Sequence, residues 1–246
     1  MPTTISIGTD GGIAVFDGQL TMDTDFGIIP EFEEYAEEAP GYPGRYVSGV
    51  NPKTRDLTLV FRVTKAWALQ AAYIRSLAAL INPSLGEMIL QDQNDSGKQL
   101  MVYAGKPSYK RRHSGLVVSL PLVGRPYWES TTTHTLDNSG TAANAGNAPC
   151  PCTITFAAGT DPSITIGGTT VSYTGTIAVG SKVEVDTLHK TAAYINIGSG
   201  ARANALANVA VTIGGASTED WPWLAVGNNT VTTAATTQIS WQDWWI

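Results

Sequence analysis

The sequence contains three sets of side chains whose types could support chemistry: two cysteines, a run of carboxylates and a run of basic residues. Cys150 and Cys152 lie two residues apart in a Pro-Cys-Pro-Cys segment. Two thiolates could hold a metal ion, but a zinc site needs two further ligands. A disulfide across a single residue would be strained. We therefore expect two reduced cysteines that lead into a strand, with no metal and no cofactor, because the histidines show no ligand spacing: His113, His134 and His189.

The carboxylates lie in a segment rich in turn-forming residues, at positions 30–49. A glycosidase uses two carboxylates, but it also needs a cleft and one raised pKa. A run of charges is more often a solvated face. Prolines and glycines in this segment favour a long loop or a protruding hairpin. The sequence has no Gly-x-Ser-x-Gly motif and no phosphate-binding glycine loop, so it favours a protein that is not an enzyme. The five residues are Glu31, Glu33, Glu34, Glu37 and Glu38.

The basic run consists of Lys106, Lys110, Arg111 and Arg112. Such a run can contact phosphates, but the net charge of −6 and the pI of about 5.0 argue against a general nucleic-acid binder. The acidic and basic segments could meet within one subunit or across a subunit boundary. They could also be two independent solvated loops. The nine charged residues are our candidates for a subunit interface.

Length and composition indicate a folded protein with a sizeable core. The chain has 246 residues, of which 43% are hydrophobic and 15% are charged. This composition excludes disorder driven by charge and low hydropathy. No apolar run approaches the length of about 18 residues that a membrane span needs. Residues 1–10 have no basic start and no apolar core, so we expect no secretory signal.

The charge distribution predicts two domains, 1–130 and 131–246. The first part holds 12 basic and 14 acidic residues, whereas the second holds 3 and 7. Threonine shifts in the opposite direction, from 8 residues to 22. Such a step in composition is typical of a domain boundary. The polar segment 131–149 is rich in Ser, Thr, Asn, Gly and Ala and is predicted to be the junction.

Hydrophobic periodicity predicts a mostly β protein with one helix in the first domain. A spacing of four and three residues from Trp67 to Ile81 predicts a helix that begins near Thr64 and ends at Asn82-Pro83, with Ala71 and Ala78 in its apolar stripe. Alternating residues predict the strands around it, together with a hairpin near Gly11-Gly12. The predicted strands lie at 57–63, 88–91, 100–103 and 116–122.

The second domain alternates with period two almost throughout. Pairs such as Ile154 with Phe156 and Val183 with Val185 are separated by turn signals, including Gly167-Gly168 and Gly214-Gly215. Many short strands at this spacing predict a β-sandwich or barrel. Five of the seven tryptophans fall in the last 26 residues. We expect Trp221 or Trp223, and Trp241, in the core, and Trp244-Trp245-Ile246 packed back on the sandwich or against an interface.

The order of these parts resembles that of the distal tail proteins of long-tailed, non-contractile bacteriophages, the siphovirus tail component family. The first domain is similar in its strand 55–63, its helix 65–81 and the exit segment 120–129. The second domain is similar in its entry at 138–156. The clearest segment is 221–231, which resembles the family pattern of aromatic-Pro-x-Leu-x-x-Gly-x-Asn.

The resemblance implies two β-sandwich domains, the first with one α-helix and the second galectin-like. It implies a virion protein, assembled in the host cytoplasm, that forms a hexameric ring at the distal end of the tail. Such a ring joins the tail tube protein to the tail-tip hub protein and, in some phages, supports receptor-binding proteins. The chain corresponds to the short form without inserted sugar-binding modules.

Two other classes remain open at the level of sequence. A carbohydrate-binding module of a tail or cell-surface adhesion device would use an exposed tryptophan in a groove. A polysaccharide-degrading enzyme would need two carboxylates facing one cleft, and the sequence marks no such pair. A ring component needs neither feature.

Overall fold

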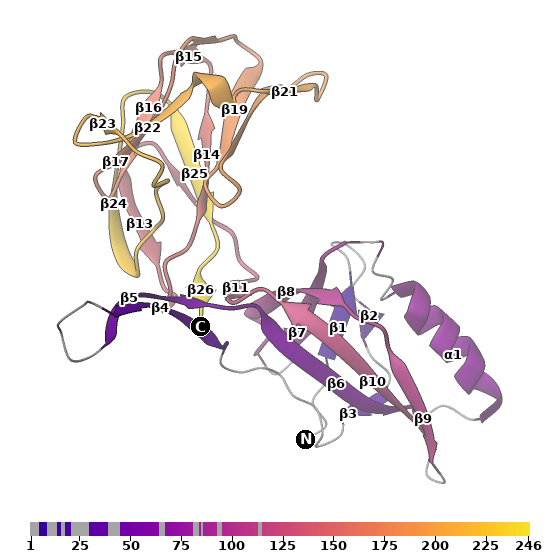
Figure 1. Ribbon diagram of the computed structural model, residues 1–246. Helices are drawn as coiled ribbons and strands as arrows, with labels where there is room; N and C mark the ends of the chain where they lie inside the picture. The colour runs from indigo at the N-terminus through magenta and orange to yellow at the C-terminus, as the bar shows by residue number, and fades with distance from the viewer. Residues whose placement is uncertain are drawn as a thin grey trace. The chain divides into compact units, whose positions relative to one another are not determined.

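The chain divides into two compact units, shown in Figure 1. The first contains residues 1–129 together with residue 246, and the second contains residues 130–245. The computed structural model describes residues 5–8, 14–15, 18–20, 30–38, 45–63, 67–80, 84, 86–92, 95–112 and 115–246. The described residues form antiparallel sheets and one α-helix, which confirms the predicted class: mostly β, rich in β-sandwich structure, with a single helix.

The first unit contains an extended antiparallel sheet with the strand order β2-β1-β7-β8-β10-β6-β3, and β9 pairs with β10 beside β8. The predicted hairpin at the start of the chain is confirmed by the pairing of Ser6 with Val15. The strands are β1 (Ile5–Gly8), β2 (Ala14–Val15), β3 (Gly18–Leu20), β6 (Arg55–Val63), β7 (Met88–Asp92), β8 (Lys98–Ala104), β9 (Ser108–Arg112), β10 (Gly115–Gly124) and β11 (Trp128–Ser130).

One face of this sheet carries the core of the first unit. Strand β6 alternates, with Leu57, Leu59 and Phe61 each 1% exposed. Strands β7, β8 and β10 add Met88, Leu100 and further apolar residues to the same cluster. The four central strands predicted from the sequence are therefore confirmed, because period-two burial places every second side chain on the core face.

Helix α1 (Trp67–Leu80) packs against this core through Tyr73 and Ile74. The predicted apolar stripe is wrong in part, because Ala71 and Ala78 are exposed while Gln70 is buried. Alanine offers little apolar area, so the larger side chains of Tyr73 and Ile74 set which side of the helix faces the sheet. Both predicted helix ends lie outside the described residues.

The acidic segment forms one strand of a separate two-stranded sheet, β4 (Phe32–Glu38) with β5 (Arg45–Pro52). The pairing runs from Phe32 with Pro52 to Glu38 with Arg45, with a register shift between Tyr35 and Ala36. Of the two alternatives predicted for this segment, the hairpin is therefore the one observed.

The second unit is a sandwich of two six-stranded sheets with the orders β12-β25-β14-β19-β20-β21 and β13-β24-β16-β17-β22-β23. The first sheet contains β12 (His134–Asp137), β14 (Cys152–Phe156), β19 (Ser181–Asp186), β20 (Thr191–Asn196), β21 (Arg202–Asn204) and β25 (Thr237–Trp241). The second contains β13 (Gly140–Asn144), β16 (Ser163–Ile166), β17 (Thr169–Tyr173), β22 (Val209–Ile213), β23 (Ala216–Ser217) and β24 (Gly227–Thr233). Shorter elements are β15 (Gly159–Thr160), β18 (Thr176–Ile177), the 3-10 helix η3 (Leu206–Asn208) and β26 (Trp244–Trp245).

Alternating burial in both sheets confirms the period-two prediction for this unit. Strand β14 buries Cys152, Ile154 and Phe156, and the other strands follow the same pattern. The predicted turns at Gly167-Gly168 and Gly214-Gly215 are confirmed, because all four glycines have positive φ between +57° and +93°.

Residues 131–149, predicted to be the junction between the two domains, are not a linker but part of the second unit. This segment supplies β12 and β13, one strand to each sheet of the second unit. The inward residues of β13 are Ala142 and Asn144, which are 0% and 1% exposed. Because neither is a large apolar residue, the sequence shows no alternating hydrophobic pattern for this strand. No helix in the described part of the chain is long and apolar enough to cross a membrane.

Candidate functional site: charged strands and the ion-pair network

The five candidate glutamates lie at the start of and along β4. Glu31 directly precedes the strand, and its backbone oxygen accepts a hydrogen bond of 2.7 Å from the Lys53 backbone nitrogen. Glu33, Glu34, Glu37 and Glu38 are residues of β4 itself. Glu31 and Glu33 have exposed side chains. The hairpin therefore carries an acidic strand rather than an acidic loop.

The basic candidates lie on and beside β9. Lys106 follows β8, while Lys110, Arg111 and Arg112 belong to β9 and pair with Val117, Leu116 and Gly115 of β10. The sequence did not predict this strand, because Ser-Tyr-Lys-Arg-Arg has no alternating apolar residues. The long β10 provides the partner edge on which the basic segment is extended.

Among the candidates whose side chains the structure describes, the acidic and basic groups do not meet. Glu31, Glu33, Lys106 and Lys110 are exposed, and in the described part of the chain none of these four forms an ion pair. Their charges face solvent in a single copy. They are therefore accessible to a partner of opposite charge, which is the arrangement that an interface between subunits requires.

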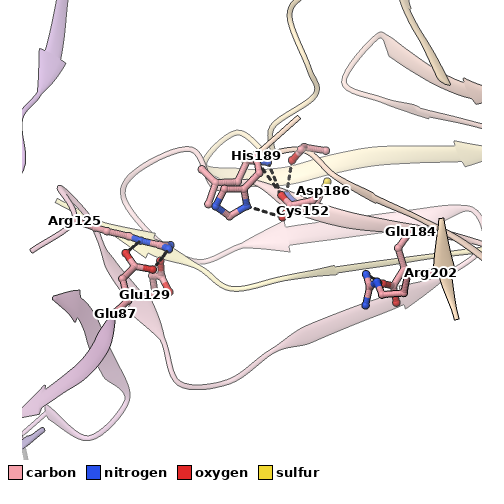
Figure 2. A network of polar contacts seen from close by, with 10 residues as sticks. Glu87, Arg125, Glu129, Cys152, Glu184, Asp186, His189 and Arg202 are labelled. Carbon is pink, nitrogen blue, oxygen red and sulfur yellow. Dashed lines mark hydrogen bonds and ion pairs between the residues drawn. The ribbon is translucent and has the colours of Figure 1, made fainter. Parts of the chain in front are cut away.

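A cluster that the sequence did not single out lies near the end of the first unit, where Arg125 binds two glutamates (Figure 2). The Arg125 guanidinium donates to both carboxylate oxygens of Glu87, at 2.7 and 2.5 Å. It also donates to Glu129 at 3.1 Å. Glu87 lies just before β7, Arg125 lies just after β10, and Glu129 is the last residue of segment 1–129. The paired hydrogen bonds of Arg125 therefore hold these three positions together.

Burial and charge act in opposite directions on this cluster. Glu129 is 6% exposed, and burial raises its pKa, although the Arg125 charge and hydrogen bond lower it. The hydrogen bond from Arg125 to Glu87 raises the pKa of Arg125, with burial acting against it. Nearby, the Arg55 side chain donates to the Pro126 backbone oxygen at 2.9 Å. The cluster fixes the chain where it leaves the first unit, and its position is that of the exit motif 120–129.

Two smaller polar groups brace the surface of the second unit (Figure 2). Asp186 accepts hydrogen bonds from the backbone nitrogens of Leu188 and His189, and its other oxygen contacts His189 Nδ1 at 2.7 Å. Glu184 binds Arg202 of β21 at 2.9 Å. These groups hold a turn and an edge strand, so His189 has a structural role here.

The entry and exit of the second unit are tied together by His134 and Asp243. His134 Nε2 lies 3.1 Å from Asp243 Oδ2, and the imidazole stacks on Trp241 with ring centroids 5.5 Å apart. The Asp243 backbone oxygen accepts a bond from the Ser130 nitrogen at 2.8 Å. These contacts hold the start of β12 against the segment that follows β25.

Cys150 and Cys152 are free and buried, which confirms the prediction of two reduced cysteines leading into a strand. Burial raises the pKa of both thiols to about 12, and the charge of Asp243 adds to the effect at Cys150. The Cys152 backbone nitrogen donates to Thr187 Oγ1. Within the described residues, no cluster of three or more His, Cys, Asp or Glu side chains has the geometry to hold a metal ion.

The segment 221–231 is organised around Asn229, which is 6% exposed. Its amide accepts from the Ala225 nitrogen and donates to the backbone oxygens of Ala142, Ala225 and Gly227. These bonds hold residues 225–227 beside β13. The preceding residue, Leu224, is 0% exposed. The asparagine at the end of the aromatic-Pro-x-Leu-x-x-Gly-x-Asn pattern is therefore a structural residue.

The tryptophans follow the core prediction only in part. Trp241 is buried as expected, but Trp223 is 37% exposed, and its ring meets Trp244 edge-on at 5.4 Å. Trp244 is 5% exposed, and its backbone oxygen accepts hydrogen bonds from the nitrogens of Asn147 and Ala148, so Trp244 packs back on the second unit as predicted. Trp221 and Trp245 are half-buried.

Comparison with known proteins identifies the architecture. No family model and no curated protein matches the chain. The crystal structure of the Dit protein (gp 19.1) of phage SPP1, described as a paradigm of hub adsorption apparatus in phages that infect Gram-positive hosts, matches with a TM-score of 0.71 and 14% identity over 98% of this chain and 99% of that chain.

Two structures of the phage P2 baseplate in its activated conformation also match. The structure with Ca has a TM-score of 0.55 and 8% identity over 99% of this chain and 98% of the other. The structure with Sr has a TM-score of 0.54 and 7% identity over 98% and 97%. At these identities the match concerns the fold and extends across both units. The resemblance drawn from the sequence is confirmed at this level: the chain has the fold of phage distal tail (Dit-type) hub proteins.

Proposed function

We propose that this chain is a structural component of a phage tail tip, in which six copies form a ring at the distal end of the tail. The ring joins the tail tube protein to the tail-tip hub protein. The observation that carries the proposal is the full-length match to SPP1 Dit, because both units and their order are shared with a protein of a hub adsorption apparatus.

The two domains have different roles in this proposal. Residues 1–130 form the ring, and residues 131–246 form a galectin-like sandwich that supports host-attachment proteins, including a receptor-binding protein. The charged strands β4 and β9 both belong to the first domain, and their described charged side chains, Glu33 and Lys110, are exposed, which supports its assignment as the ring-forming part. The second domain carries only 10 of the 36 charged residues.

The contact between neighbouring copies uses the two sets of charged residues. A closed ring needs a head-to-tail interface made of two different surfaces on each copy. The acidic set Glu31, Glu33, Glu34, Glu37 and Glu38 and the basic set Lys106, Lys110, Arg111 and Arg112 are two such surfaces. Within the described residues, Glu31, Glu33, Lys106 and Lys110 form no ion pair in one copy, which supports a contact with the next copy.

The role is structural, without catalysis, cofactor or specific nucleic-acid binding. The protein is assembled in the host cytoplasm and is carried in the virion. This part of the proposal is supported by the nature of the structural neighbours, which are hub and baseplate proteins.

Electron microscopy of particles labelled with a gold-conjugated antibody against this chain tests the proposal. We expect label at the tip of the tail on intact particles. An antibody against a head protein is the matched control, and it should label the opposite end. Label along the tail shaft or on the head, or no label on particles in which the antigen is exposed by mild dissociation, would refute the proposed role.

A further inference from the structure

Two strands of the first unit each have one partner among the described strands. Strand β4 pairs with β5, and β9 pairs with β10. In the part of the chain that the structure describes, no strand pairs with the second edge of either one, and the backbone N–H and C=O groups of that edge have no strand partner there. Proteins commonly protect such edges with charges, because an unprotected edge adds to another chain.

The charges on these two edges are opposite in sign. The β4 sequence is Phe-Glu-Glu-Tyr-Ala-Glu-Glu, and the β9 sequence is Ser-Tyr-Lys-Arg-Arg. Like charges on directly opposite residues destabilise a strand pair, whereas opposite charges stabilise it. Two acidic strands or two basic strands would repel each other, so the charges select a pair made of one β4 and one β9.

Each strand also carries an exposed aromatic residue. Phe32 of β4 is 45% exposed and Tyr109 of β9 is 43% exposed. Aromatic cross-strand pairs add stability to a sheet. A joined β4–β9 pair therefore offers burial of apolar surface together with charge neutralisation, and the two strands are similar in length, at seven and five residues.

We propose that β4 of one copy adds to the second edge of β9 of another copy, so that the sheet of the first unit continues from copy to copy. This inference rests on the proposed ring and specifies how it closes. The two edges are different surfaces, so the contact is head-to-tail and every copy uses both. Backbone hydrogen bonds supply the contact, and the charges set its orientation and its partner.

Charge reversal in the full chain tests the pairing. The acidic variant carries Glu33→Lys and Glu37→Lys, the basic variant carries Lys110→Glu and Arg112→Glu, and the combined variant carries all four changes. We expect each two-residue variant to lose assembly in light scattering and negative-stain images, because like charges then face each other. We expect the combined variant to regain it, because the pair is again complementary.

Matched controls change the net charge equally at other exposed sites. Glu219→Lys with Asp220→Lys matches the acidic variant, and Arg75→Glu with Lys190→Glu matches the basic variant. Both controls should assemble like the wild-type chain. Circular dichroism and thermal unfolding of every variant show whether a loss of assembly comes from loss of folding. If a two-residue variant fails to fold, the assembly of the combined variant is the result that supports or overturns the pairing.

Hydrogen exchange distinguishes strand pairing from a contact of side chains alone. Amides in Phe32–Glu38 and Ser108–Arg112 should exchange at least tenfold more slowly in the wild-type assembly than in the two-residue variants. Unchanged exchange in both strands, or assembly of the two-residue variants at the wild-type level, would overturn the inference. A wild-type chain that is monomeric at every concentration would also overturn it, whereas the proposed tail-tip role would be judged by antibody labelling of particles.

Discussion

The indole nitrogen of Trp241 donates a hydrogen bond of 3.1 Å to the backbone oxygen of Ala143. Trp241 lies on β25 of one sheet and Ala143 lies on β13 of the other, so this bond joins the two layers of the second unit. The same ring stacks on His134 of β12. One side chain therefore connects the first strand of each sheet to the last long strand of the chain.

Replacing Trp241 with phenylalanine keeps an aromatic ring but removes the donor. We expect the unfolding free energy of the second unit to fall by about 1–3 kcal/mol, because the Ala143 oxygen is left without this partner and some packing is lost. Urea denaturation measures the change. Trp223→Phe is the control, because Trp223 is 37% exposed, and this substitution should lower the unfolding free energy by less than Trp241→Phe does. Equal losses in the two variants would contradict the assigned role of Trp241.

Replacing Asn229 with alanine removes four hydrogen bonds to backbone groups between β13 and the start of β24. We expect a loss of about 2–4 kcal/mol, because buried backbone groups lose their partners. Asn228→Ala is the control, since the Asn228 side chain is exposed and should change stability by less than about 0.5 kcal/mol. Thermal unfolding compares the two. A tolerated Asn229 substitution would show that these bonds do not hold the segment.

Glu87→Gln tests the paired hydrogen bonds that Arg125 makes to Glu87. The amide keeps one acceptor but loses the charge and the second acceptor, so we expect the first unit to lose about 1–3 kcal/mol. Urea denaturation followed by tryptophan fluorescence gives this value. Asp95→Asn removes a carboxylate that pairs with Lys98 at an exposed site, and it should have little effect.

Glu129 predicts a pH dependence, because burial raises its pKa above the unfolded value. A carboxyl with a raised folded-state pKa favours folding fully below its unfolded pKa, and this contribution is lost as pH rises through the folded pKa. The stability of the wild-type chain relative to Glu129→Gln should therefore increase as pH falls from 7 toward 4. A relative stability that falls over this range would mean that the Arg125 charge outweighs burial.

Cys150 and Cys152 predict a second pH dependence, in the alkaline range. Their folded-state pKa of about 12 lies above the ordinary thiol pKa of 9.0, so their contribution to stability is present below pH 9 and is lost as pH rises toward 12. At pH 10 each thiol is ionised in the unfolded chain but protonated in the folded chain, so each should lower the free energy of unfolding by about 1–2 kcal/mol relative to pH 7. Thermal unfolding of the wild-type chain and of a variant with both cysteines replaced by alanine isolates this difference. A thiol reagent at pH 8 should modify the native thiols much more slowly than the unfolded ones.

Hydrophobic periodicity was sufficient to predict the strands whose side chains alternate between buried and exposed. Leu57, Leu59 and Phe61 on β6, and the pairs on β14 and β19, face a core on one side and solvent on the other, so the pattern is visible without a structure. The helix was found for the same reason. Its predicted apolar side was wrong in part, because alanines such as Ala71 are apolar in sequence whether or not a sheet covers them.

Strands β9 and β13 could not be predicted, because tertiary context determines them. The basic residues of β9 are extended by pairing with β10. The small residues of β13 are extended by pairing with β24, and Asn144 donates a hydrogen bond to the Leu224 backbone oxygen. The Arg125 cluster was also missed, since Glu87 lies 38 residues from Arg125 and no spacing rule connects them. The charge segments were found, but no pattern showed that both form strands.

The central claim is that copies of this chain close into a six-fold ring. Light scattering after gel filtration, with negative-stain images of the same peak, tests it most directly. The predicted result is a particle of six times 26.0 kDa, or about 156 kDa, that appears as a ring with a central hole. A closed ring of another number, an open fibre, or a chain that stays monomeric when mixed with its tail tube and hub proteins would contradict the account.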